Sequence, residues 1–304
     1  MCDHDTQKDA EAFLKEQGKM SRRTFASAAS LAGLSAAFAG CSGGTEATGA
    51  DISKVSSNLI RSDVSVPTPD GTADCYFVHP KEGAHAGAII WPDVKGIRPA
   101  FKMMGERLAM AGYAVLVINP YYREKAAPVF PLDVDVRDKA TREKMFSYAR
   151  KTNAETNAID TKAFVEFLDA QDVVDTSRKI GTSGYCYGGP ITMNAASSYP
   201  ERIGAGASFH GGRLVTDKPD SPHLKIGQMQ AEFLFAIAQN DDDKDPEVKN
   251  VLRDAYAAAG LKAEIEVYEG ALHGWCPPDS PVYNEAAAEK AWSRLLALYE
   301  RALA

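Results

Sequence analysis

Short apolar runs alternate with helical periodicities along most of the chain. Runs that end at Pro or Gly predict buried strands, and they cover residues 72–80, 86–92, 113–120, 178–185, 203–211, 231–240 and 263–270. Apolar positions at helical spacing predict helices over residues 99–112, 154–170, 190–200, 246–260 and 284–304. This alternation predicts a single α/β domain over residues 59–304, with a mostly parallel sheet and helices on both faces. We expect the earliest strands to form an antiparallel edge.

One connection in this pattern is unusually long. Residues 119–153 contain several prolines and then a charged segment with Met145, Phe146 and Ala149 at helical spacing. Long connections in compact domains are commonly functional. We therefore expect this one to form a cap beside a substrate pocket.

The N-terminal residues have a different composition. Arg22 and Arg23 precede a weakly apolar stretch rich in Ala, Ser and Gly, so residues 1–41 resemble a twin-arginine export signal. "FAGC", ending at Cys41, resembles a lipoprotein cleavage box, and residues 42–58 have the composition of a flexible tether. We expect the export machinery to recognise this signal and the protein to reside in the periplasm, with Cys41 as a candidate site for a lipid anchor. An amphipathic or disordered N-terminal arm is the alternative.

Charge and motif content narrow the classes of function. The 304-residue chain has a formal net charge of −7 and no run rich in Lys and Arg, which argues against binding to nucleic acid or anionic membranes. It contains no dinucleotide-binding or Walker motif and no cluster with metal-ligand spacing. We expect neither a metal nor a cofactor.

The stretch "GYCYGG" is the most informative in the sequence. It places Cys186 between Gly184 and Gly188, where a predicted strand turns into a predicted helix. This is the pattern of a nucleophile elbow, in which a tight turn exposes the nucleophile and leaves no room for a Cβ two residues to either side. The helix N-terminus favours a thiolate. The alternative is an inert buried thiol.

The elbow predicts its partners, because in this fold an acid and then a histidine follow the nucleophile. The acidic run "DDDKD" directly follows the predicted strand 231–240, and His273 is the only histidine beyond that strand. Either feature could instead be an ordinary loop group. The backbone N–H groups of Tyr187 and Val94 are the expected donors of an oxyanion hole.

At this point the chain resembles the dienelactone hydrolase family of the α/β-hydrolase superfamily, over about residues 60–304. The resemblance is carried by "GYCYGG", "FLFAIAQND" and "ALHGW". It implies a carboxylic-ester hydrolase of the carboxymethylenebutenolidase type, with Asp241 as the acid of a Cys186–His273 triad and Asp242 or Asp243 as alternatives. It also implies that Asp93 occupies the place of a family glutamate near the thiol.

The resemblance further implies that Arg142 binds a substrate carboxylate, whereas a second family arginine after the histidine has no counterpart here. Trp275 is expected to line the pocket. Cys276, three residues after His273, suggests a disulfide with Cys186 in an oxidising compartment.

Three functions compete. The first is hydrolysis of a small-molecule ester or lactone through an acyl-thioenzyme. The second is an acyl transferase or thioesterase that uses the same triad. The third is a ligand-binding or redox module without turnover.

Overall fold

A computed structural model describes residues 8, 9, 12, 58–136 and 138–304. The predicted export signal, apart from residues 8, 9 and 12, and the predicted tether, apart from residue 58, lie outside the described residues. The elements are β1 (Leu59–Thr68), β2 (Gly71–Pro80), β3 (Gly87–Trp91), α4 (Pro99–Met110), β4 (Ala114–Ile118), α5 (Lys139–Ala149), α6 (Ala154–Asp169), β5 (Ile180–Tyr185), α7 (Gly188–Ser198), β6 (Ile203–Phe209), the 3-10 helix η1 (Pro222–Gln228), β7 (Glu232–Ala238), α8 (Gln239–Lys244), α9 (Val248–Ala259), β8 (Ala263–Tyr268) and α10 (Glu285–Ala302). In this described part, no helix combines the length and apolar character needed to cross a membrane.

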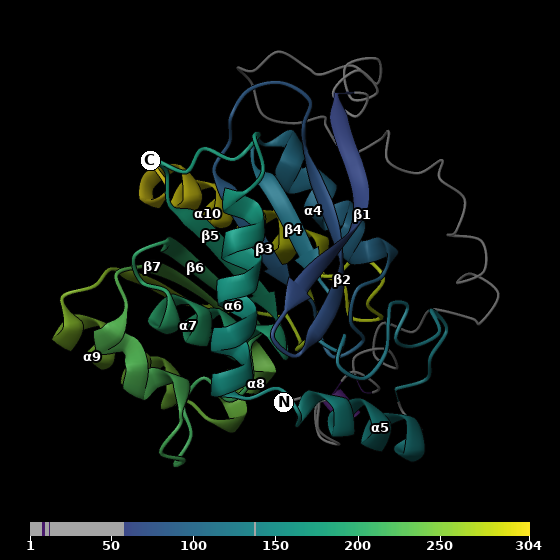
Figure 1. Ribbon diagram of the computed structural model, residues 1–304. Coiled ribbons are helices and arrows are strands. Elements are labelled where there is room, and N and C mark those ends of the chain that lie inside the picture. The colour runs from purple at the N-terminus through teal and green to yellow at the C-terminus, as the bar shows by residue number, and fades with distance from the viewer. Residues whose placement is uncertain (1–7, 10–11, 13–57, 137) are drawn as a thin grey trace, which may run out of the picture.

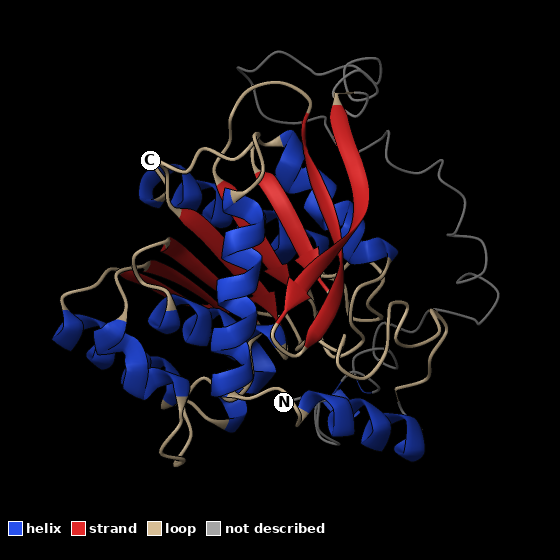
Figure 2. Cartoon of the chain, in the orientation of Figure 1, coloured by secondary structure: helices blue, strands red, loops and turns tan. Residues whose placement is uncertain are grey.

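The strands form one twisted sheet (Figures 1 and 2). Its order is β1-β2-β4-β3-β5-β6-β7-β8. β1, β2 and β4 pair antiparallel, and every pair from β4–β3 to β7–β8 is parallel. The predicted parallel sheet with an antiparallel edge is therefore confirmed. The central strands β3, β4, β5 and β6 are buried at every position, as expected for strands covered on both faces.

Helices cover the two faces of the sheet, as the sequence predicts (Figure 1). α4 and α10 pack on one face, where Phe101 and Leu298 join the apolar core. α6, α7 and α9 pack on the other, where Phe164 and Leu252 join a second core. The two cores fix the sheet between two helical layers and make its strand ends a rigid platform.

The carboxyl ends of the parallel strands bring the predicted chemical groups to one edge of the sheet. Val94 follows β3, Cys186 follows β5, Asp241 lies just beyond β7 and His273 follows β8. In open α/β sheets this edge is where ligands bind. The fold thus gathers at one place residues that are far apart in the sequence.

Candidate active site

Cys186 lies on a strained turn between β5 and α7. Its backbone has φ 53°, in the left-handed region that side chains other than glycine rarely adopt. A Cβ on Gly184 would lie 2.0 Å from the carbonyl oxygen of Gly188, and one on Gly188 would lie 2.3 Å from that of Trp91. The Cys186 N–H donates to the carbonyl of Phe209 at 3.0 Å. Gly184 is therefore required by the close approach of α7, and Gly188 by the close approach of the end of β3.

His273 and Asp241 meet beside this turn. Nδ1 of His273 lies 2.6 Å from Oδ2 of Asp241, and the His273 backbone N–H donates to Oδ1 of Asn240 at 2.8 Å. Of the two alternative acids, Asp242 is paired with Lys249 at 2.6 Å and Asp243 is exposed. Asp241 is therefore the carboxylate that the structure brings to the histidine.

The ring of His273 is held in a charged environment. Burial alone would lower the pKa of His273, but the negative charges of Cys186 and Asp241, and hydrogen bonds with both side chains, raise it to about 9. The Cys186 sulfur is therefore within hydrogen-bonding reach of the imidazole. Thiol, imidazole and carboxylate form one connected chain, as required for a nucleophile activated by a base.

A cavity of about 580 Å³ opens at Cys186, and Val94 and Tyr187 also line it. Within the described part of the chain, the backbone N–H groups of Val94 and Tyr187 donate to no backbone carbonyl outside the regular elements and to no side chain. Two such donors beside a nucleophile have the composition of an oxyanion hole.

The long connection 119–153 contributes the wall of this cavity, where a cap was predicted. Phe146, Ala149, Arg150 and Thr152 at the end of α5 line it. Residues of the segment 212–222 also line the cavity, among them Arg213 and Lys218. The cavity thus combines an apolar interior with positively charged side chains.

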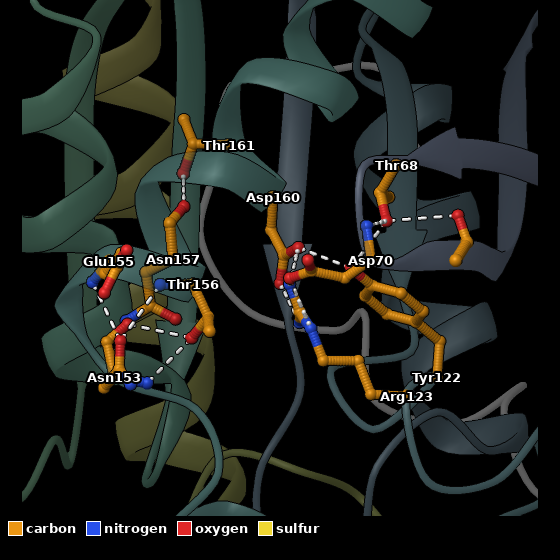
Figure 3. Close-up of polar contacts among 11 residues, drawn as sticks. Thr68, Asp70, Tyr122, Arg123, Asn153, Glu155, Thr156, Asn157, Asp160 and Thr161 are labelled. Carbon is orange, nitrogen blue, oxygen red and sulfur yellow. Dashed lines mark hydrogen bonds and ion pairs between the residues drawn. The ribbon is translucent and has the colours of Figure 1, made fainter.

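Asparagines of the neighbouring helices complete the lining, and a buried ion pair fixes the helix that carries two of them (Figure 3). Asn153 caps the N-terminus of α6 and Asn157 lies one turn further on. One turn beyond that, Asp160 accepts from Nη1 and Nη2 of Arg123 at 2.9 and 2.7 Å and from the hydroxyl of Tyr122 at 2.7 Å. This ion pair anchors α6 to the loop after β4 and so sets the position of the cavity wall.

Three residues expected near the substrate occupy other positions. Arg142 lies on α5 but does not line the cavity that contains Cys186. Trp275 is fully buried and stacks on Tyr268 at 4.8 Å between ring centroids. Asp93 does not line this cavity either, because Nη1 and Nη2 of Arg98 bind its two carboxylate oxygens at 2.7 and 2.9 Å.

The suggested disulfide is not present. Among the described residues, none of Cys75, Cys186 and Cys276 forms a disulfide. Cys276 belongs to the core under α4 and α10, and burial raises the pKa of its thiol well above the usual range. Cys276 is thus a core residue in this structure.

His210 is a neighbour of the site that the sequence analysis missed. Its ring lies 5.1 Å from that of His273 in an edge-to-face arrangement, and its backbone has φ 40°. Both ring nitrogens are buried without a hydrogen-bond partner among the described residues. Burial, and then the charge of His273, hold the pKa of His210 well below its usual value. The sequence did contain one signal for it, because His210 directly follows β6, the strand that pairs with the strand before the elbow.

No group of three or more His, Cys, Asp or Glu side chains in the described ranges is placed to hold a metal ion. The groups gathered around Cys186 are instead a thiol, an imidazole, a carboxylate and backbone N–H donors. This set contains the elements of nucleophilic acyl chemistry.

Comparisons with known proteins agree with this architecture. The profile of the dienelactone hydrolase family matches residues 73–303. A candidate carboxymethylenebutenolidase of Salmonella typhi is 27% identical over 76% of this chain and 84% of its own length, and one of Methylorubrum extorquens is 26% identical over 93% of both. The crystal structure of a candidate dienelactone hydrolase of Klebsiella pneumoniae has the same fold, with a TM-score of 0.69 and 22% identity over 80% of this chain and 99% of that one. The chain is a hydrolase and belongs to the dienelactone hydrolase family within the α/β-hydrolase superfamily.

Proposed function

We propose that this hydrolase cleaves an ester or lactone bond of a small molecule, with Cys186 as nucleophile, His273 as general base and acid, and Asp241 as the residue that orients the imidazole. One observation carries the proposal. Cys186, which lines the cavity, stands in a left-handed turn within hydrogen-bonding reach of His273, whose Nδ1 is 2.6 Å from Asp241.

The first half of the reaction forms an acyl-thioenzyme. The Cys186 thiolate attacks the carbonyl carbon, and the N–H groups of Val94 and Tyr187 receive the developing oxyanion. As the intermediate collapses, the carbon–oxygen bond breaks and the imidazolium of His273 protonates the leaving alkoxide. Asp241 keeps the ring in the tautomer that faces the sulfur.

Water completes the cycle. Neutral His273 removes a proton from a water molecule, whose oxygen attacks the thioester carbon. The carbon–sulfur bond breaks, the acid product leaves and the Cys186 thiolate and the His273 imidazolium are restored. Charge and protons therefore balance within the residues named and one water molecule.

Turnover of p-nitrophenyl acetate tests this proposal. We expect the Cys186→Ala variant to lose its activity while keeping the wild-type circular dichroism spectrum. We expect Cys186→Ser to fold and to turn over far more slowly, because a hydroxyl is much harder to ionise than a thiol. Equal rates for wild-type and Cys186→Ala proteins would refute the proposal. Transfer of the acyl group to an added alcohol in preference to water would instead indicate a transferase.

The charges on the cavity wall extend the proposal to an anionic substrate. Arg150, Arg213 and Lys218 line the cavity, and Asp220 is the one carboxylate among its lining residues. A carboxylate that enters the cavity would therefore meet the positive charges of Arg213 and Lys218. Monomethyl succinate and methyl butyrate are test esters of similar size, of which only the first carries a negative charge, so a comparison of their KM values isolates the effect of the charge. We expect Arg213→Gln to raise KM for monomethyl succinate and to leave KM for methyl butyrate unchanged. The same comparison on Arg142→Gln tests whether Arg142 binds the substrate carboxylate, as the family resemblance implies.

We also propose that the protein is exported through the twin-arginine route and acts in the periplasm. The proposal rests on Arg22 and Arg23 and the Ala-rich stretch that follows them. Replacement of both arginines by lysine should retain the protein in the cytoplasm on cell fractionation. A lipid at Cys41 would place the mature protein in the membrane fraction, and Cys41→Ser would release it. Unchanged periplasmic accumulation of the Arg22→Lys/Arg23→Lys protein would exclude this route.

A further inference from the structure

Arg98 is a buried cation held between two carboxylates from distant segments. It directly precedes α4 and is only 6% exposed. On one side its Nη1 and Nη2 donate to Asp93 at 2.7 and 2.9 Å. On the other side its Nε and Nη2 donate to Asp279 at 2.6 and 2.9 Å, across 181 positions of sequence. Both contacts are bidentate, the geometry that a planar guanidinium provides and an ammonium does not.

The carboxylate of Asp279 is an ionised partner of Arg98. Although burial opposes ionisation of Asp279, hydrogen bonds with Arg98 and the charge of Arg98 hold the pKa of Asp279 below its usual value. Lys95 adds a second positive charge, with Nζ 3.5 Å from Asp279. The cluster is therefore a charge-compensated link and not a single surface ion pair.

One end of this link holds the loop that carries Val94. Oδ1 of Asp93 accepts from the Lys95 N–H at 2.9 Å, and Nη1 of Arg98 donates to the Gly96 carbonyl at 3.2 Å. The hydroxyl of Tyr121 donates to the Val94 carbonyl at 3.1 Å. Side chains therefore hold the backbone at Val94 and at the two residues that follow it, and we infer that they set the direction of the Val94 N–H.

The other end holds the loop that follows His273. Asp279 lies in the segment 274–284, which the Asn284 N–H closes by donating to the Trp275 carbonyl at 3.1 Å. This segment begins one residue after His273. Arg98 thus joins the segment that follows the histidine to the segment that carries an oxyanion donor, and it does not line the cavity itself.

We propose that Arg98 is a positioning residue that sets the Val94 N–H in register with the ring of His273 by clamping Asp93 and Asp279. The inference rests on the proposed function, since it concerns the oxyanion hole of that reaction. A loosened clamp leaves substrate binding in the cavity unchanged but misplaces a donor that acts on the transition state. Its effect falls on kcat and not on KM.

Two variants of the full-length protein test the clamp. Arg98→Lys keeps the positive charge but cannot make two hydrogen bonds to each carboxylate. Asp279→Asn removes the charge of one of the two carboxylates, at a half-exposed position. With p-nitrophenyl acetate we expect kcat to fall about 10- to 100-fold, less than the 10²–10³ typical of losing a donor outright, with KM within about twofold. Arg107→Lys is the matched control, because Arg107 lies on α4, which Arg98 precedes, and it likewise binds a carboxylate, that of Glu289, through two hydrogen bonds. It should leave kcat unchanged.

Two further readouts separate positioning from general damage. A trifluoromethyl ketone adds to the thiolate and places an oxyanion in the hole, so its affinity should weaken by the same factor as kcat. Alkylation of Cys186 by iodoacetamide needs the thiolate but no oxyanion hole, so its rate should remain close to that of the wild type.

The results that overturn the proposal are specific. A folded Arg98→Lys or Asp279→Asn protein with wild-type kcat and ketone affinity would exclude the clamp, and so would a parallel loss of kcat, ketone affinity and alkylation rate. If Arg98→Lys does not fold, Asp279→Asn decides the question. Failure of the proposed function gives a different pattern, since the wild type itself would then lack Cys186-dependent turnover.

Discussion

Nδ1 of His273 lies 2.6 Å from Oδ2 of Asp241, although the two residues are 32 positions apart. β7 and β8 are adjacent parallel strands, and their carboxyl ends deliver the acid and the histidine to the same point. The Asn240 amide, which accepts from the His273 backbone N–H, holds the two loops together. The pairing of β7 with β8 therefore determines the distance between Asp241 and His273.

Replacement of Asp241 by Asn tests this pair. The amide cannot stabilise an imidazolium and favours the wrong tautomer, so we expect kcat to fall about 10²- to 10⁴-fold with the fold retained. Asp242→Asn is the control, because Asp242 binds Lys249 and not the histidine. Steady-state kinetics on both variants decide the matter. Equal losses of kcat in Asp241→Asn and Asp242→Asn would contradict a specific role of Asp241 in the mechanism.

The pKa of His273 predicts a pH dependence. Since the folded value is about 9, above the usual 6.5 or so, the imidazolium persists into alkaline solution. Its contribution to stability is complete below about pH 6.5 and is lost as the pH rises through about 9. For an alkyl ester, whose alkoxide needs a proton, kcat/KM should fall on the alkaline side near pH 9. A profile that keeps rising beyond pH 10 or so would be inconsistent with an imidazolium donor.

The elbow glycine predicts a steric effect. A Cβ at Gly184 would lie 2.0 Å from the carbonyl oxygen of Gly188 and 2.4 Å from its carbonyl carbon, and these backbone atoms of α7 cannot move aside as a flexible side chain could. We expect Gly184→Ala to lower the melting temperature and to abolish turnover. At Gly227 no atom lies within 4 Å of the added Cβ, so Gly227→Ala serves as the control and should behave as the wild type. Thermal unfolding and turnover of both proteins provide the comparison.

The buried carboxylate of Asp160 predicts a loss of stability. It is 1% exposed and binds Arg123 through both oxygens (Figure 3). Asp160→Asn removes the buried counter-charge of the guanidinium and leaves only the more exposed Asp70, so we expect a loss of about 3–5 kcal/mol in the free energy of unfolding. Asp70, which also binds Arg123 but is 38% exposed, is the control, and Asp70→Asn should cost about 1 kcal/mol or less. Similar losses on urea unfolding would contradict this account.

Much of the fold could be predicted from the sequence, because buried parallel strands leave continuous apolar runs. β1 lacks that signal. Of its ten residues only Leu59 and Val66 are buried, so its limits could not be derived from periodicity.

The parts of the site that depend on chain order were also predictable. The glycines around Cys186 and the position of His273 beyond β7 are properties of spacing along the chain. Arg98 is different, because its partner Asp279 is 181 positions away and no local pattern connects them. Trp275 shows the converse. It is two residues from His273, yet it points into the core and stacks on Tyr268.

The most direct test of the account is the mass of the protein during turnover. Wild-type enzyme mixed with p-nitrophenyl acetate and quenched in acid within milliseconds should carry one acetyl group, and peptide mapping should place it on Cys186. The Cys186→Ala protein should carry none. An acetyl group on any other residue of the wild type, or an unmodified Cys186 during rapid turnover, would contradict the assignment of this thiol as the nucleophile.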